Sequence, residues 1–274
     1  MAAPKKASLN FSKETTIIKK DKKPTAAIIW MHGLGDTAMG WTNAIEAIIS
    51  KMPYITGILP TAPMISITFQ GGQAATAWHD IEDLQNLTNN TFKYKEDSLK
   101  LITALIDDCV DNQGIHPSRI ILGGFSQGAA MAIYCGLQYK ARLGGIVALS
   151  GYLCDMDVAK KVQNAETKQI PIIMYHGNND MIVQTQFGRL SAMLLKSGGF
   201  EHTQWEEFEI PMQMNFGHNV VQAELNKVAK FVAQNLPKEY KLNKNKPPPQ
   251  QEEKENEKNN NQKVNSNNKK DNGD

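Results

Sequence analysis

The pentapeptide Gly124-Phe125-Ser126-Gln127-Gly128 is the stretch of this sequence best suited to chemistry. A G-x-S-x-G pattern between a strand and a helix is typical of a nucleophile elbow, a tight turn that pushes the serine out at the end of a sheet. Glycines are needed on both sides, because bulky side chains would not fit this turn. The N–H of Gln127, at the start of the following helix, can then donate to a developing oxyanion. A glycine-softened turn with a helix-capping serine gives the same pattern, so a base, an acid and a second oxyanion donor must support the hypothesis.

The second oxyanion donor is predicted in the loop His32-Gly33-Leu34-Gly35-Asp36. This loop follows a continuous apolar run, residues 26–31, which is typical of a strand covered on both faces of a parallel sheet. α/β-Hydrolases place the other half of the oxyanion hole after such a strand, upstream of the serine. The predicted donor is the backbone N–H of Leu34. An ordinary strand-ending turn accounts for His32-Gly33 equally well.

A serine hydroxyl is a weak nucleophile at neutral pH and needs a histidine to take its proton. In α/β-hydrolases the chain order is serine, then acid, then histidine. This order excludes the histidines before Ser126 and leaves His176, His202 and His218. His218 lies in a loop between the last predicted strand and the last predicted helix. Such a loop returns over the carboxyl edge of the sheet, so His218 is the predicted base, whereas His202 opens a strand and has no loop around it.

Asp180 is the predicted acid, because it ends a strand-to-helix loop at the same edge of the sheet. Its carboxylate would fix the tautomer of the histidine and stabilise the imidazolium. If His176 were the base, the acid would have to come from a poorly patterned stretch containing Asp155, Asp157 and Glu166. An isolated aspartate at such a position is most often a turn or capping residue, so the prediction depends on the elbow. The predicted triad is Ser126, Asp180 and His218.

The elements that position these residues alternate along the chain. Apolar runs predict strands at 26–31, 54–59, 119–122, 145–149, 171–175 and 205–210, and apolar residues at helical spacing predict helices at 44–49, 96–110, 129–134, 187–195 and 221–232. The alternation predicts an α/β fold, with a mostly parallel central sheet and helices on both faces. Residues 60–93 are predicted as a long irregular, functional segment. Its apolar side chains either line an acyl groove or pack the segment on the core: Met64, Ile65, Ile67 and Phe69.

Composition divides the chain into three regions. Residues 1–23 are predicted to be a flexible basic arm with one edge strand at Ile17-Ile18, and residues 24–240 the hydrolase domain. Residues 241–274 are rich in Asn, Lys and Glu and hold almost no large apolar residue, so a disordered tail is predicted.

Charge and cysteine content narrow the function classes. The net charge of +2 argues against nucleic acid as a partner, while the basic N-terminus favours a weak peripheral contact with anionic membranes. The three cysteines Cys109, Cys135 and Cys154 have no C-x-x-C spacing, which argues against disulfides and a zinc site and favours a reducing compartment. There is no secretory signal, apolar stretch of membrane-spanning length or lipid-anchor motif. We expect a cytoplasmic protein without metal or cofactor, present as a monomer or weak homodimer.

With these residues in place, the chain resembles the acyl-protein thioesterases, in the phospholipase/carboxylesterase family of α/β-hydrolases. The matching stretches are His32-Gly33-Leu34-Gly35-Asp36-Thr37, Trp78-His79-Asp80, Arg119–Gly128, His176-Gly177-Asn178-Asn179-Asp180 with Val183, and Gly217-His218. The resemblance implies that Ser126 is the nucleophile, Asp180 the acid and His218 the base, with the N–H groups of Leu34 and Gln127 as the oxyanion hole.

The resemblance also implies a reaction. The family hydrolyses fatty acyl thioesters on protein cysteines, and many members cleave lysophospholipids and small esters. We therefore expect a palmitoyl-protein hydrolase acting on S-acylated proteins through an acyl-enzyme; the alternative is a broad carboxylesterase or lysophospholipase. Hypotheses of another class are an inactive hydrolase fold that binds lipid and a scaffold acting through the tail.

Three departures from the family pattern lie beside the site. The family usually has an aromatic residue where this chain has His79, and a proline after the triad aspartate where it has Met181. The loop before the base is often Gly-Met-Gly/Met-His, whereas residues 214–218 read Met-Asn-Phe-Gly-His. We expect these changes to affect the preference for an acyl chain more than the reaction.

Overall fold

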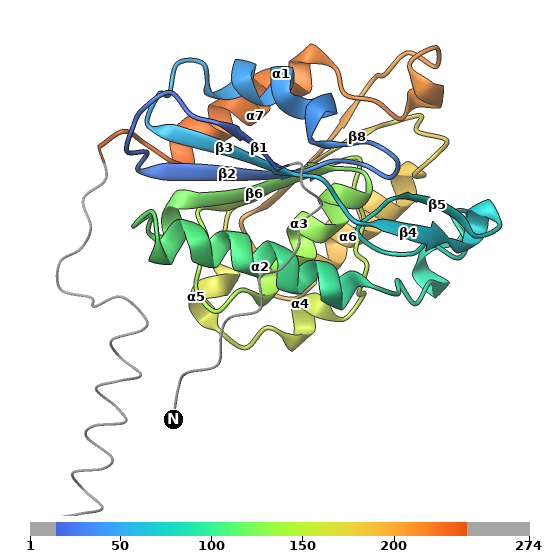
Figure 1. Cartoon of the computed structure of the whole chain (residues 1–274). Coiled ribbons are helices and arrows are strands. Elements are labelled where there is room, and N and C mark those ends of the chain that lie inside the picture. Colours follow the sequence, from blue (N-terminus) through green and yellow to red (C-terminus); the bar gives the residue numbers. More distant parts are fainter. Residues whose placement is uncertain (1–14, 240–274) are drawn as a thin grey trace, which may run out of the picture. The chain divides into compact units, whose positions relative to one another are not determined.

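A computed structural model describes residues 15–239, and a seven-stranded sheet lies at its centre (Figure 1). The strand order is β1-β3-β2-β6-β7-β8-β9; every neighbouring pair is parallel except β1 with β3. The strands are β1 (Thr15–Ile18), β2 (Ala26–Met31), β3 (Ile55–Pro60), β6 (Ile120–Phe125), β7 (Gly145–Leu149), β8 (Ile172–Gly177) and β9 (Thr203–Phe208). The predicted mostly parallel sheet is confirmed.

Helices cover both faces of this sheet, as predicted (Figure 1). One face carries α1 (Ala38–Ile49) and α7 (Gln222–Asn235). The other carries α2 (Lys95–Asp111), α3 (Gln127–Gln138), α6 (Thr185–Ser197) and the short helices α4 (Val158–Lys161) and α5 (Ala165–Lys168).

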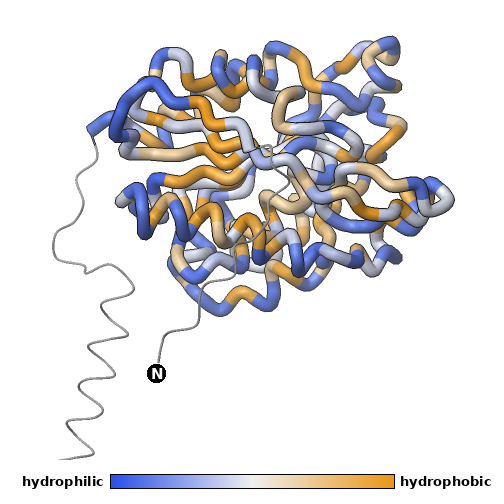
Figure 2. The backbone as a smooth tube through the Cα atoms, viewed as in Figure 1, coloured by the Kyte–Doolittle hydropathy of each residue, from blue (hydrophilic) through white to orange (hydrophobic). Residues whose placement is uncertain are grey.

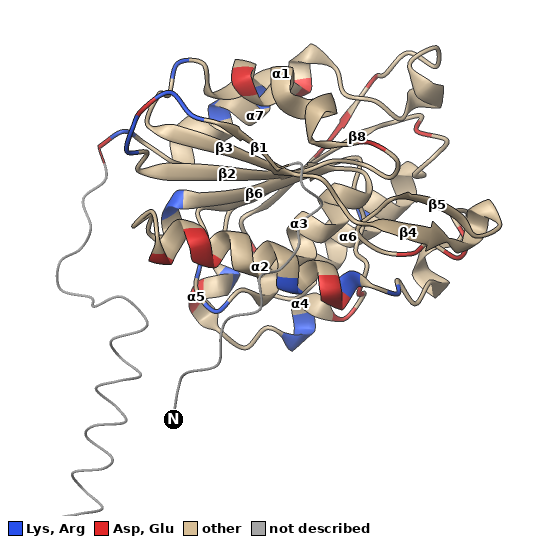
Figure 3. Cartoon of the chain, in the orientation of Figure 1, with Lys and Arg blue, Asp and Glu red and all other residues tan. Residues whose placement is uncertain are grey.

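Strand β2 shows why a continuous apolar run marks a strand buried on both faces. Ala27, Ile29 and Met31 join the core beneath α2 and α3, whereas Ala26, Ile28 and Trp30 join the core beneath α1 and α7. Successive side chains of a strand point to opposite faces, so each core receives three of the six residues. Apolar residues concentrate in the strands in Figure 2, and charged residues in Figure 3 lie mainly on the outer helices and the loops.

The edge strand predicted within the basic arm is present. Residues 15–18 of the predicted arm form β1, the edge strand, which pairs with β3. Ile18 is buried, and its carbonyl accepts a hydrogen bond from the hydroxyl of Thr56 (3.1 Å). The strand is therefore part of the core. Residues 1–14 of the arm and the predicted tail lie outside the described residues.

Residues 60–93 are more regular than predicted. Strands β4 (Met64–Ile67) and β5 (Gln73–Thr76) pair as an antiparallel hairpin, followed by a 3₁₀ turn at Leu87–Asn89. Ile67 is fully buried, so it belongs to the core, whereas Met64 is 63% exposed. Local packing accounts for Ile67, one of the two roles expected for these apolar residues.

Parallel strands bring the loops that carry the predicted site residues to one edge. The carboxyl ends of β2, β6 and β8 lead into the loops at residues 32–37, 126 and 178–184. The loop after β9, which contains His218, leads into α7. Sites in open α/β sheets form at this edge.

Candidate active site

Ser126 occupies the turn between β6 and α3 in a backbone conformation that residues other than glycine rarely adopt. Its φ is 55° and its ψ is −120°. The turn is held by the Ser126 N–H, which donates to the carbonyl of Leu149 at the end of β7 (2.8 Å), and by the Ser126 carbonyl, which accepts from Ala130 in α3 (3.1 Å). The predicted strand, turn and helix are present, and the strain at Ser126 is of the kind that functional sites retain.

The glycine at position 128 is required by the close approach of α3 to the end of β2. A Cβ atom on Gly128 would lie 2.1 Å from the carbonyl oxygen of Met31. A Cβ atom on Gly124 would lie 2.4 Å from the carbonyl carbon of Gly128. Any side chain at either position would push the helix start away from the sheet.

Asp180 and His218 form a hydrogen-bonded pair below the surface. The Nδ1 of His218 lies 2.6 Å from Oδ2 of Asp180, and the two side chains are 6% and 0% exposed. The other carboxylate oxygen, Oδ1, accepts from the N–H groups of Ile182 and Val183 (both 2.9 Å). Because a carboxylate only accepts, His218 carries its proton on Nδ1 and presents Nε2 as an acceptor. This is the state in which a histidine can take a proton from serine.

The pKa of Asp180 reflects these partners. Burial by itself would raise the pKa, but the neighbouring His176 ring and the hydrogen bond from His218 lower it, so that the pKa lies at about 2. Asp180 is therefore a carboxylate at neutral pH, as the acid of a triad must be.

The base and the predicted oxyanion loop both come close to Ser126. The ring of His218 lies 4.7 Å, between centroids, from the ring of Phe125, the residue directly before the serine. In the loop after β2, a Cβ atom on Gly33 would lie 3.5 Å from the Cβ of Ser126. The structure thus brings the elbow, the Asp180–His218 pair and the loop after β2 to one place.

The loop after β2 is held rigidly. His32 is buried, and its Nε2 accepts from the N–H of Ala62 (2.9 Å), which requires the proton on Nδ1. Burial is the main cause that lowers the pKa of His32. The carbonyl of His32 accepts from the indole N–H of Trp78 (2.9 Å), and the N–H of Gly35 donates to Thr76 of β5 (2.8 Å). The loop is therefore ordered before any substrate arrives.

Two backbone donors remain available beside the serine. Among residues 15–239, the N–H groups of Leu34 and Gln127 have no hydrogen-bond acceptor. The Gln127 N–H is also the first of helix α3, where the helix dipole favours negative charge. These are the two donors that the sequence predicted for an oxyanion hole.

The side chain of Gln127 has a role that sequence reasoning missed. Its Oε1 accepts from the N–H of Trp78 (2.7 Å), and its Nε2 donates to the carbonyl of His79 (2.8 Å). The elbow is thereby fastened to the loop that follows β5. No spacing rule relates positions 127 and 78, so the sequence held no sign of this contact.

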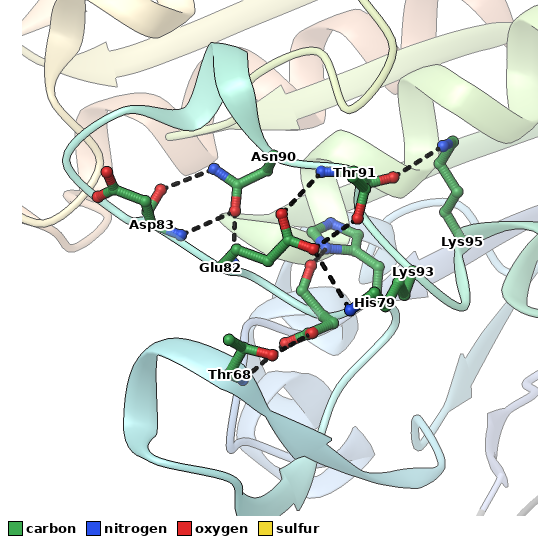
Figure 4. A network of polar contacts seen from close by, with 9 residues as sticks. Thr68, His79, Glu82, Asp83, Asn90, Thr91, Lys93 and Lys95 are labelled. Atoms are coloured by element: carbon green, nitrogen blue, oxygen red, sulfur yellow. Dashed lines mark hydrogen bonds and ion pairs between the residues drawn. The ribbon is translucent and has the colours of Figure 1, made fainter.

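His79, one of the three departures, is part of that loop. It is fully buried, edge-on to the ring of Phe92 (5.0 Å between centroids), with its Nε2 3.4 Å from the hydroxyl of Tyr152. Burial is the main cause that lowers its pKa to about 4. Figure 4 shows His79 beside the polar network of the loop, in which the side-chain oxygen of Asn90 accepts from the backbone of Glu82 (2.5 Å).

The rejected alternatives do not converge on the serine. Asp155 pairs with Lys161 (2.7 Å) and Asp157 with Lys160 (3.2 Å), and Glu166 lies on the exposed helix α5. His202 contacts the side chain of Gln169 at the surface (3.1 Å). His176, by contrast, lies next to the acid of the pair, with its Nε2 3.4 Å from Oδ2 of Asp180.

A serine at a strand-to-helix elbow, with a histidine of a later loop close to the same turn, is the arrangement typical of the α/β-hydrolases. Comparison with known proteins narrows this class. Residues 12–236 match the model of the phospholipase/carboxylesterase family, and the chain belongs to that family. It is accordingly a hydrolase.

Several relatives are similar over most of their length. "Acyl-protein thioesterase 1 homolog 2" of Dictyostelium discoideum is 35% identical over 81% of this chain and 97% of its own. "Acyl-protein thioesterase 1" of Gibberella zeae is 37% identical over 78% of this chain and 92% of its own. Among solved structures, acyl-protein thioesterase 2 of Zea mays aligns with a TM-score of 0.68 and 28% identity, over 81% of this chain and 99% of that one. The resemblance inferred from the motifs is confirmed.

Proposed function

We propose that this protein is a palmitoyl-protein hydrolase, which removes fatty acyl groups from protein cysteines through an acyl-enzyme. The observation that carries the proposal is the buried Asp180–His218 pair beside the strained Ser126. The names of the relatives, acyl-protein thioesterases, support the choice of substrate.

In the proposed acylation step, Nε2 of His218 takes the proton of Ser126 as the hydroxyl oxygen attacks the thioester carbonyl. The N–H groups of Leu34 and Gln127 hold the oxyanion of the tetrahedral intermediate. As the intermediate collapses, the carbon–sulfur bond breaks, and His218 gives its proton to the departing thiolate. Asp180 stabilises the imidazolium while the proton is on the ring.

In the deacylation step, His218 takes a proton from water, which attacks the acyl carbonyl of the ester on Ser126. The oxyanion forms again in the same hole. Collapse returns the proton to the Ser126 oxygen and releases the fatty acid. All proton transfers pass through one histidine, which is why its tautomer matters.

The proposal extends to partners and location. S-acylated proteins are the proposed substrates and the cytoplasm the proposed location, with weak peripheral contact to anionic membranes through the basic N-terminus and no role for nucleic acid. Within residues 15–239, no helix combines the length and apolar character needed to cross a bilayer.

The second candidate is a broad carboxylesterase or lysophospholipase, and the description of the matching family favours it. The two functions share their catalytic residues and differ in the group that leaves. Relative values of kcat/KM for a palmitoylated peptide, a lysophospholipid and a short nitrophenyl ester separate them.

The test is hydrolysis of a palmitoylated peptide thioester by the full chain, compared with Ser126→Ala. We expect the substitution to lower kcat by at least about 10⁴-fold, because no other group can form the acyl-enzyme. Ser66→Ala is the matched control, since the Ser66 hydroxyl binds only the carbonyl of Gly72 in the exposed hairpin turn. Equal activity of wild type and Ser126→Ala would refute the proposal. Activity on lysophospholipid or ester alone would select the second candidate.

A further inference from the structure

His176 stands next to the triad without belonging to it. It lies in β8, its side chain is fully buried, and its Nε2 is 2.8 Å from the carbonyl oxygen of Val183. Because that carbonyl only accepts, Nε2 must carry the proton of the ring. The same Nε2 lies 3.4 Å from Oδ2 of Asp180, longer than the bond to Val183, so Val183 is the main acceptor.

The ring is held from the opposite side as well. Its Nδ1 is buried and has no hydrogen-bond partner within residues 15–239. Helix α6 approaches there so closely that a Cβ atom on Gly188 would lie 2.5 Å from Nδ1. The ring of Trp205, in β9, lies 5.7 Å away between centroids. The imidazole therefore cannot move away from Val183 without displacing a helix or a strand.

Val183 links His176 to the acid. Its carbonyl accepts from His176, and its N–H donates to Oδ1 of Asp180 (2.9 Å). One peptide segment is thus fixed by the histidine and in turn fixes the carboxylate. The second oxygen, Oδ2, is then directed at His218.

We propose that His176 is a positioning residue of the active site, which holds the turn at residues 177–183 so that Asp180 meets Nδ1 of His218. The proposal rests on the proposed function, because it assigns Asp180 and His218 to the reaction. His176 touches neither the reacting atoms nor the substrate. Its effect passes through Val183 and the carboxylate.

Few charged groups face this ring. Asp180 lies on the turn and His218 beyond it, while Glu207 of β9 is held by Arg189 of α6 (2.6 Å). Since Glu207 already has a cationic partner, the loss of the His176 ring acts mainly on the turn and on Asp180.

The test compares three substitutions in the full chain: His176→Gln, His176→Asn and His176→Phe. The amide nitrogen of glutamine can take the place of Nε2 and donate to Val183. The shorter side chain of asparagine places its amide nitrogen only where Nδ1 of the histidine ring was, too far from Val183 to donate. Asparagine is therefore a matched control that carries the same amide group. Phenylalanine fills the site without a donor.

We expect His176→Asn and His176→Phe to lower kcat by about 10- to 100-fold with KM unchanged, because a small misplacement of a catalytic group costs this much. His176→Gln should stay within about 3-fold of wild type, since it restores the donor. The independent readout is the far-downfield proton NMR resonance of the short His218–Asp180 hydrogen bond. It should persist in the glutamine variant and weaken or vanish in the other two.

The NMR readout does not require turnover, so it separates this proposal from the proposed function. A protein that fails to hydrolyse thioesters but shows the expected resonances would refute only the proposed substrate. Unchanged resonance and kcat in His176→Phe would refute the positioning role. Should the asparagine and phenylalanine variants not fold, His176→Gln decides alone: a retained resonance supports the role, and its loss refutes it.

Discussion

Replacing Asp180 with asparagine should abolish catalysis, because it moves the ring proton of His218 from Nδ1 to Nε2. The carboxylate is held at Oδ1 by the N–H groups of Ile182 and Val183 (both 2.9 Å). Those two donors require an oxygen, so the side-chain amide of the introduced asparagine can orient only one way. Its nitrogen must take the place of Oδ2, 2.6 Å from Nδ1 of His218.

Two donors would then face each other, and His218 must change its tautomer. Nδ1 becomes the acceptor and Nε2 carries the proton, so the ring can no longer accept a proton from Ser126. In a serine protease, the same aspartate-to-asparagine change gives the histidine the wrong tautomer and lowers kcat by about 10⁴-fold. This corresponds to about 5 kcal/mol in the activation free energy. We expect a loss of the same order here, with a smaller change in KM.

The same substitution should also lower the stability of the fold at neutral pH, as the lowered pKa of Asp180 indicates. The pKa of Asp180 in the folded protein, about 2, is below its ordinary value of 3.8. The carboxylate therefore stabilises the fold above pH 3.8, and this contribution is lost as the pH falls through 2. Asp180→Asn should lower the free energy of unfolding by up to about 2 kcal/mol at pH 7 and by little at pH 2.

The assay is steady-state hydrolysis of a short nitrophenyl ester at pH 7.5, with the rate of fluorophosphonate labelling of Ser126 as a second measure. Asp157→Asn is the matched control, because Asp157 contacts Lys160 at the exposed surface. Circular dichroism verifies the fold. If Asp180→Asn kept more than about a tenth of the wild-type kcat, the tautomer argument would be wrong.

Two further predictions concern the fold around the site. Gly128→Ala should abolish activity and lower the melting temperature, because its Cβ would lie 2.1 Å from the carbonyl oxygen of Met31; an unchanged melting temperature would contradict this. Glu224 is buried in α7, which raises its pKa from 4.5 to about 7 despite the hydrogen bond from Val221, so the stability present below pH 4.5 is lost as the pH rises through 7. The free energy of unfolding in urea should therefore fall by about 2.5 kcal/mol more in the wild type than in Glu224→Gln from pH 5 to pH 8. Unfolding free energies that change equally with pH in the two proteins would contradict this.

The sequence predicted most of the sheet, because buried parallel strands leave a local pattern. The runs at 26–31 and 145–149 match β2 and β7 to the residue. Chain order and loop position were enough to pair Asp180 with His218, which the structure places 2.6 Å apart. These predictions rest on features that each stretch carries by itself.

The hairpin β4–β5 could not be predicted in this way. Its strand β5, Gln73–Thr76, has no apolar alternation, and both its outer residues are polar. The hairpin is positioned by distant contacts instead. The hydroxyl of Thr76 donates to the carbonyl of Asp36 (2.7 Å), and the N–H of Gly35 donates to the carbonyl of Thr76 (2.8 Å).

The same limit applies to the departures from the family pattern, which the structure divides into two kinds. Met181 follows the acid and is 61% exposed, so it can contact a substrate directly. His79 is fully buried, and its carbonyl receives the side chain of Gln127. A side chain at position 79 that did not fit this buried site would displace the backbone carbonyl that holds Gln127, whose N–H is one of the two donors described above. The sequence placed both residues beside the site, but only the tertiary contacts distinguish a residue that meets the substrate from one that supports the catalytic turn.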